Sequence, residues 1–350
     1  MLIRTDDYEY EKIPTPLLKW YDENKRDLPW RHNPTPYRVW VSEIMLQQTR
    51  VEAAKEYYLR FLKELPDVYA LANCDEDKLM KLWEGLGYYS RARNLQKAAK
   101  QIVEKYDGVF PDDEKSLKEL SGIGDYTVGA IRSIAFGKRA PAIDGNVFRV
   151  LSRLAMNGTD ISNPKYKAYL FEKLIKVYPN EGERCSAFTQ ALMELGALIC
   201  KPTSPDCINC PLQKICLANA QNAQENYPVL PEKRAKKVEK LYVFHIRYDD
   251  GIAVRKRESG VLKGMYELPS VIDEGQGYEN ALKTLGVTDY AFIKKKGFTH
   301  IFTHIKWEMT CVYIRAKNGG FERFTDEAIV EKISLPTAFR QCLIGKDDEV

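Results

Sequence analysis

The sequence predicts a two-part chain, with an all-helical N-terminal part and a C-terminal part of mixed α+β structure. Three observations lead to this prediction. Apolar residues recur at helical steps through most of residues 14–200, four cysteines follow within residues 200–216, and apolar and polar residues alternate from Leu241 onward. We therefore expect a first domain at residues 1–225, a linker at 226–240 and a second domain at 241–345.

Length and charge limit what this protein can be. Its 350 residues exceed one typical domain, and its net charge of +4 is only mildly basic. A nucleic-acid partner would therefore have to be held by local patches and backbone amides. Because the sequence has no long apolar run and no apolar segment at its start, we expect a soluble, cytoplasmic protein. We also expect it to be a monomer.

Helical patterns dominate the first hundred residues. Residues 13–25 predict a short helix, and a proline-rich loop that includes Arg31 follows it. The helical pattern resumes from Tyr37 to about Leu65 in one or two pieces, with Glu43 inside it. A glutamate in such a helix is usually at the surface, whereas a buried one would have a raised pKa and could act as an acid.

A glycine-rich turn interrupts the helices expected within residues 75–105. The stretch GLGYYSRARN places Tyr88 next to arginines. Rings beside cations suit a DNA-facing edge, where side chains wedge between bases and arginines hold phosphates. An ordinary packed corner is the alternative.

Two further motifs precede expected helices. The first is a pair of glycines, and the second is a carboxylate. Gly122, Ile123 and Gly124 predict a hairpin between two helices, whose backbone amides can bind a phosphate. A simple helix turn is the alternative. Further on, Asp144 and Asn146 come just before a helix expected at residues 147–154, so Asp144 is an N-cap, a carboxylate at the mouth of a cleft, or both.

The cysteines Cys200, Cys207, Cys210 and Cys216 are separated by gaps of six, two and five residues. Such compression predicts a metal site. Zinc ribbons usually show two C-x2-C pairs set well apart, and only one is present here. The spacing therefore favours a [4Fe-4S] cluster over zinc, and both over disulfides.

Together these motifs resemble the helix-hairpin-helix DNA glycosylases of the endonuclease III superfamily. Three stretches, SEIMLQQT at 42–49, GLGYYSRARNL at 85–95 and IDGNVFRVLSR at 143–153, resemble the MutY family of adenine DNA glycosylases. Bifunctional members carry a lysine nucleophile two residues after the last hairpin glycine, where this chain has Tyr126. The resemblance thus implies a monofunctional enzyme. One departure is Ser121, which stands where the superfamily usually has proline.

The resemblance also implies roles for individual residues. Glu43 would protonate the departing adenine, Asp144, ionised at its helix start, would stabilise or trap the sugar, and Tyr126 would orient Asp144 or the attacking water. The partner would be double-stranded DNA with adenine opposite 8-oxoguanine or guanine, in base-excision repair near the bacterial nucleoid. The residues expected to bind this DNA in the first domain are Arg31, Gln48, Thr49, Tyr88, Gly122, Gly124 and Asn146.

The C-terminal part changes character after a linker with a basic run at residues 233–237. Strands are expected at 241–248, 251–257 and 306–316, and helices at 278–285 and near 326–332. The stretch GVLKGMYELPS resembles the opening of a Nudix fold, although the glutamate-rich helix that binds magnesium in Nudix hydrolases is missing. We expect a Nudix-like domain without pyrophosphatase activity.

Within that domain, Phe302, Thr303 and His304 match a Phe-Ser-His loop that contacts 8-oxoguanine in MutY proteins. A plain strand pair around a turn is the alternative.

Two other functions share most of these features: a lyase-type pyrimidine glycosylase and a non-enzymatic DNA- or cluster-binding protein. Tyr126 argues against the first, and the pairing of Glu43 with Asp144 argues against the second.

Overall fold

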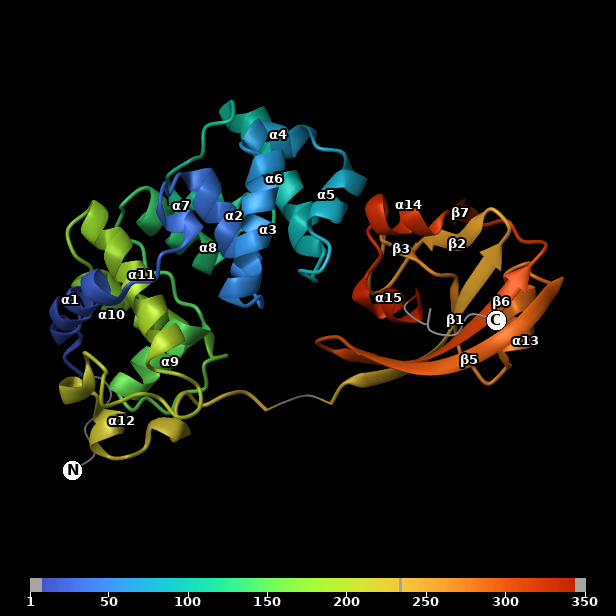
Figure 1. Ribbon diagram of the computed structural model, residues 1–350. Coiled ribbons are helices and arrows are strands. Elements are labelled where there is room, and N and C mark those ends of the chain that lie inside the picture. Colours follow the sequence, from blue (N-terminus) through green and yellow to red (C-terminus); the bar gives the residue numbers. More distant parts are fainter. Residues whose placement is uncertain (1–7, 233–234, 344–350) are drawn as a thin grey trace. The chain divides into compact units, whose positions relative to one another are not determined.

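The computed structural model describes residues 8–232 and 235–343, which form two compact units (Figure 1). The first unit contains residues 8–73 and 94–232, and the second contains residues 74–93 and 235–343. The linker residues Lys233 and Arg234 and the last two residues of the predicted second domain lie outside the described residues.

The first unit is helical in its described elements, as the sequence predicts. Besides short 3₁₀ turns and a π-helical turn at Ile131–Ala135, its helices are α1 (Pro14–Asn24), α2 (Pro36–Leu46), α3 (Val51–Glu64), α4 (Val68–Asn73), most of α6 (Ser90–Tyr106), α7 (Glu114–Lys118), α8 (Asp125–Ala130), α9 (Gly145–Leu154), α10 (Pro164–Val177), α11 (Glu183–Leu198) and α12 (Leu217–Ala220).

Local signals fix where these helices begin. Thr35 accepts a hydrogen bond from the amide of Arg38 at the start of α2, and Asp113 caps α7 in the same way through Ser116. The long pattern expected from Tyr37 to Leu65 resolves into α2 and α3. They are separated by a turn in which Gln48 has a φ of 58°.

The turn at residues 83–89 is shorter than the sequence suggested. Helix α6 already begins at Ser90, inside the stretch expected to interrupt it. Arg91 stabilises the turn by donating to the carbonyls of Leu86 and Gly87 at 3.0 and 3.2 Å. The helix can therefore start directly after Tyr89.

A single apolar core joins α1, α9, α10 and α11. Helix α9 lies within it, and Val147, Val150 and Leu151 are fully or almost fully buried. The start of α9, where Asp144 stands, is thereby held in place.

The predicted hairpin is present between α7 and α8. Gly122 has a φ of 76°, and a Cβ there would lie 2.7 Å from that of Asn94, so only glycine fits. Ser121 donates its amide to the side chain of Gln101 at 2.8 Å, a bond that the proline usual in the superfamily could not make.

The second unit is an α+β fold. Its elements are α5 (Glu76–Leu82), β1 (Lys237–Tyr248), β2 (Gly251–Lys256), β3 (Tyr266–Glu267), β4 (Ser270–Ile272), α13 (Tyr278–Thr284), β5 (Tyr290–Ile301), β6 (Ile305–Ala316), β7 (Glu322–Phe324), α14 (Asp326–Glu331) and α15 (Thr337–Leu343). The strand order is β3-β2-β1-β6-β5, and β1 runs parallel to β6.

Helices cover both faces of this sheet. Helix α13 packs on the face that carries Phe244 and Val312, whereas α14 and α15 pack on the face that carries Val243 and Met309. The strands and helices expected from the sequence are present. Helix α15, the first half of β5 and the short strands β3, β4 and β7 were not predicted.

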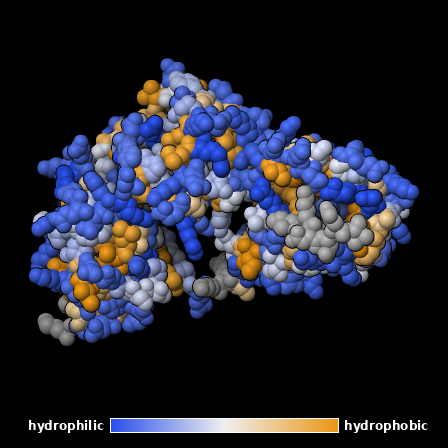
Figure 2. Space-filling view, in the orientation of Figure 1, coloured by the Kyte–Doolittle hydropathy of each residue, from blue (hydrophilic) through white to orange (hydrophobic). Residues whose placement is uncertain are grey.

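Two properties concern the surface of the chain. In the described residues, none of the helices is long and apolar enough to cross a membrane. The face seen in Figure 2 is mostly hydrophilic, with small scattered apolar patches.

Candidate active site

One cavity of about 590 Å³ in the first unit collects most of the residues singled out from the sequence. Those that line it are Arg31, Glu43, Gln48, Thr49, Tyr126, Asp144 and Asn146. They come from the 3₁₀ turn at Pro29–Arg31, from α2 and the turn after it, from α8 and from the start of α9. Gly122 and Gly124 are not among the lining residues.

Glu43 is buried in the wall of this cavity, with only 6% of its surface exposed. Burial raises its pKa to about 7, and the nearby Asp144 adds to the effect. Hydrogen bonding from Tyr126 and the charge of Arg31 act in the opposite direction. The expectation that Glu43 lies at the surface is therefore wrong. Its buried carboxyl can hold a proton near neutral pH.

Tyr126 donates its hydroxyl to Glu43 in a short hydrogen bond. From the sequence, we had expected this hydroxyl to orient Asp144 or the attacking water. Burial, followed by the neighbouring carboxylates, raises the pKa of Tyr126 well above its usual value, so the phenol stays a donor. Because a donor favours the ionised carboxylate, Tyr126 limits how far the pKa of Glu43 rises.

Asp144 is both an N-cap and a cavity residue. It accepts hydrogen bonds from the amide of Val147 and from the side chain of Asn146, each at 2.8 Å. We had expected the helix start to favour its ionised form. Instead burial outweighs these bonds and raises the pKa of Asp144, since desolvation of the carboxylate costs more than they return.

A second group of charged residues also lines the cavity, and the sequence analysis had identified only one of its members, Arg31. Glu194 on α11 accepts from the Arg26 side chain at 2.7 and 2.9 Å and from Arg31 at 3.0 and 3.1 Å. Burial alone would raise its pKa, but the two guanidinium groups lower it to about 2. The sequence did contain a signal for this group. Glu194 stands inside the apolar helix α11, where a buried charge needs a partner of opposite charge.

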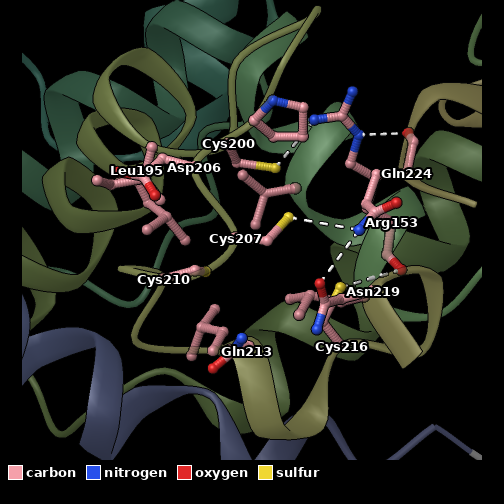
Figure 3. A pocket seen from close by; sticks show the side chains of 15 residues that line it. Arg153, Leu195, Cys200, Asp206, Cys207, Cys210, Gln213, Cys216, Asn219 and Gln224 are labelled. Atoms are coloured by element: carbon pink, nitrogen blue, oxygen red, sulfur yellow. Dashed lines mark hydrogen bonds between the residues drawn. The ribbon is translucent and has the colours of Figure 1, made fainter. Parts of the chain in front are cut away.

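The four cysteines line a separate pocket together with Arg153 and Gln224 (Figure 3). Arg153 donates to the Cys200 sulfur at 3.4 Å, and Gln224 donates to the Cys207 sulfur at 3.6 Å. Among the described residues, no three His, Cys, Asp or Glu side chains are arranged to hold a single metal ion. Sulfurs around a common pocket with donors directed at them suit a larger, negatively charged group.

Two family models match the chain. Residues 41–176 match the HhH-GPD superfamily base excision DNA repair protein, and residues 242–344 match the NUDIX domain. An adenine DNA glycosylase of Buchnera aphidicola subsp. Acyrthosiphon pisum is 36% identical over 72% of this chain and 72% of its own length. The chain belongs to the adenine DNA glycosylase family.

Other members of the adenine DNA glycosylase family are longer. The chain is 36% identical to an adenine DNA glycosylase of Arabidopsis thaliana over 85% of its residues, and this match covers 56% of that protein. The chain thus spans about half the length of this plant relative. Among solved structures, a thermostable thymine-DNA glycosylase aligns with 61% of this chain, and the alignment covers 97% of the glycosylase's own chain. The sequence identity is 29% and the TM-score is 0.55.

In this member of the adenine DNA glycosylase family, the turn at residues 83–89 exposes the side chain of Tyr88. It is 47% exposed and has a φ of 46°. Arg91 lies between the rings of Trp83 and Tyr88, 5.3 and 5.6 Å from their centres. The exposed ring of Tyr88 is therefore held in one direction.

Phe302, Thr303 and His304 form the tip between β5 and β6 in the second unit. Phe302 packs edge-on against His300 and Trp307, with ring centres 4.6 and 4.7 Å apart. Thr303 and His304 are exposed, and the Thr303 hydroxyl lies 2.7 Å from that of Tyr88. The segment is thus a turn between strands that also displays polar side chains.

The hydrogen bond between Tyr126 and Glu43 leads to a prediction about pH dependence. If protonated Glu43 is the active form, kcat/KM falls as pH rises through about 7. Tyr126→Phe removes a donor that stabilises the carboxylate, so the fall should move to higher pH. The measurement is a kcat/KM profile between pH 5 and 9 for both proteins. A shift to lower pH would contradict the assigned role of this bond.

Proposed function

We propose that this protein is a monofunctional adenine DNA glycosylase of base-excision repair. The observation that carries the proposal is the cavity in which a buried Glu43, with a pKa of about 7, stands close enough to Asp144 for their charges to interact. Its substrate would be double-stranded DNA with adenine opposite 8-oxoguanine or guanine, bound by a monomer. A soluble enzyme of the cytoplasm, working at the bacterial nucleoid, fits this role.

The chemistry requires two carboxyl groups with different tasks. Hydrolysis of an N-glycosidic bond needs a proton on the departing base and negative charge near the sugar. Glu43 supplies the proton from its buried acid form. Asp144, fixed by Val147 and Asn146, stabilises or traps the positively charged sugar until water attacks.

The target adenine must leave the helix stack to reach these groups. We propose that Gln48 and Tyr88 wedge the duplex open, since both are exposed and both have positive φ. Thr49, Arg31 and Asn146 line the cavity that receives the base. The amides at Gly122 and Gly124 bind a backbone phosphate at the start of α8.

We further propose that Cys200, Cys207, Cys210 and Cys216 hold a [4Fe-4S] cluster. Arg153 and Gln224 support this, because donors near thiolate sulfurs stabilise their negative charge. When bound, the cluster would tie α9 to the loop at residues 200–216 and supply structural order, with no role in the hydrolysis. The expected result is about four irons for each purified chain, measured by metal analysis, and stoichiometric zinc would contradict it.

The domain division at residues 1–225, 226–240 and 241–345 is part of the same proposal, with the second domain reading the lesion. The N7 proton that 8-oxoguanine has and guanine lacks can be accepted by the Thr303 hydroxyl. The exposure of Thr303 and His304 at the tip supports this.

Replacing Thr303 and His304 together by alanine should reduce the preference for 8-oxoguanine over guanine by about 10- to 100-fold, since each neutral hydrogen bond is worth roughly 0.5–1.5 kcal/mol. The measurement is the affinity for both duplexes. Thr299 belongs to the other Phe-Thr-His repeat, lies within β5 and provides the control. Thr299→Ala should keep the preference, and a loss equal to that of the double variant would argue against a specific role for the tip.

One experiment tests the function itself. The protein is incubated with duplexes that carry adenine opposite 8-oxoguanine, guanine, cytosine or thymine, and free adenine is measured before and after alkali. Adenine release from the first two duplexes, with strand breaks only after alkali, is expected. Strand cleavage without alkali would favour a lyase, and absence of any release would favour a binding protein.

A further inference from the structure

The turn at residues 83–89, which exposes Tyr88, is held in the second unit by residues about 250 positions later in the chain. The helix before it, α5, is attached through Lys81. The ammonium group of Lys81 donates to the carbonyls of Val330 and Ile333 at 2.5 and 3.0 Å. Val330 lies in the last turn of α14, where a cation near the free carbonyls is stabilising. Lys81 therefore joins the end of α5 to the end of α14.

Glu84 makes a separate attachment for the turn itself. One of its carboxylate oxygens accepts a hydrogen bond from the amide of Leu335 at 2.8 Å. The other oxygen is paired with the guanidinium of Arg340 on α15 at 2.6 Å and accepts from Lys81 at 2.8 Å. Only 10% of the Glu84 side chain is exposed. A carboxylate that is nearly buried and bound on both oxygens is fixed in position.

Contacts within the turn carry this fixed position to Tyr88. Trp83, the residue before Glu84, donates its indole N–H to the carbonyl of Gly87 at 3.1 Å. Arg91 donates to the same carbonyl, and its guanidinium lies between the rings of Trp83 and Tyr88. The orientation of the exposed ring of Tyr88 therefore depends on the turn that Glu84 attaches to α15.

Helix α5 is also attached at points that do not depend on Glu84. Asp77, in its first turn, is paired with Lys256 of β2 at 2.8 and 2.9 Å. Lys81 attaches its last turn to the carbonyls at the end of α14. The helix ends at Leu82, so Glu84 lies beyond it and holds only the turn. A role in helix packing alone therefore does not account for a carboxylate at this position.

We propose that Glu84 is a positioning residue for Tyr88. Leu335 and Arg340 hold its carboxylate, and the carboxylate holds the turn in the shape in which the Tyr88 ring can open the duplex. This inference rests on the proposed function, in which Tyr88 acts as a wedge. Loss of the contact with Arg340 lowers the extrusion of the target adenine and leaves the chemistry of the two carboxyls in the cavity unchanged.

The test measures base extrusion directly. A duplex that carries the fluorescent adenine analogue 2-aminopurine opposite 8-oxoguanine brightens when the analogue leaves the stack. Arg340→Gln should lower the equilibrium constant for extrusion at saturating enzyme by about 10-fold, the effect of losing one hydrogen bond between charged groups. Arg340→Lys keeps the charge and should retain most of the extrusion. Arg323→Gln is the matched control and should match wild type, because it removes the same charge from an arginine of the second unit that is paired with Asp250.

A second set of variants separates positioning from a general loss of stability. Glu84→Gln keeps the size of the side chain and should give a loss similar to that of Arg340→Gln, and the two together should cost no more than one of them. In a Tyr88→Ala background, Arg340→Gln should cause no further loss, because the contact acts only through the Tyr88 ring. Independent losses in either double variant would overturn the proposal. So would extrusion by Arg340→Gln at the wild-type level.

Adenine release separates this inference from the proposed function. If wild type releases no adenine from the duplex with 8-oxoguanine, the proposed function fails. If wild type releases adenine and Tyr88→Ala extrudes the analogue as well as wild type does, the wedge role of Tyr88 fails and this inference with it. If Tyr88→Ala impairs extrusion and Arg340→Gln does not, only the positioning role of Glu84 is wrong.

Discussion

Replacing Glu43 by glutamine should reduce single-turnover adenine release by about 10²- to 10⁴-fold, the usual contribution of a positioned general acid. Glutamine has nearly the same shape and cannot donate the acidic proton. DNA binding should stay close to wild type, because the side chain is buried in the cavity wall. Glu56→Gln, the same change on the exposed side of α3, serves as the control and should not alter the rate.

The same variant should change stability in a pH-dependent way. The pKa of Glu43 is raised from 4.5 to about 7 in the folded chain, so its contribution to stability is fully present below pH 4.5 and is lost as pH rises through 7. A shift of this size corresponds to about 3 kcal/mol. Glu43→Gln avoids that loss, and its thermal unfolding temperature should rise relative to wild type between pH 5 and pH 8. A difference that does not vary with pH would mean that the carboxyl is already ionised at pH 5.

Replacing Asp144 by asparagine should lower the single-turnover rate by about 10²- to 10³-fold, which is typical when one preorganised electrostatic group is removed. Asparagine is as good an N-cap as aspartate and can still accept the amide of Val147. The helix should therefore remain intact while the negative charge near the sugar is lost. The loss should appear in the rate at saturating enzyme and only weakly in DNA affinity.

A matched control for this change exists in the same unit. Asp113 caps α7 by accepting from the amide of Ser116 at 2.9 Å, and it is not among the residues that line the cavity. Asp113→Asn makes the same chemical change at another helix start and should leave the rate unchanged. If both variants lose activity equally, the effect of Asp144→Asn reflects helix capping and its assignment to the sugar is wrong.

Most elements were predictable from local signals. Helices α1, α2 and α9 begin within a residue or two of the expected positions, because prolines, caps and apolar spacing act over a few residues. The first half of β5 was missed for a physical reason. Its residues 291–293 are exposed, as are Lys295 and Lys296, and therefore show no apolar alternation. Helix α15 was also missed, although α13 and α14, which were predicted, are no longer than its seven residues.

The sequence by itself determined the chemical groups of this protein: four closely spaced cysteines, a tyrosine where a lysine nucleophile would stand, and the carboxyls Glu43 and Asp144. Only the tertiary structure decided how these groups behave. Glu43 keeps a proton near neutral pH because the fold buries it and places Asp144, about a hundred positions away, near it, while the hydrogen bond from Tyr126 limits the effect. Glu194 becomes a permanently charged partner of Arg26 and Arg31 for the same kind of reason. Protonation depends on desolvation and on neighbouring charges, and these are set by packing between distant segments.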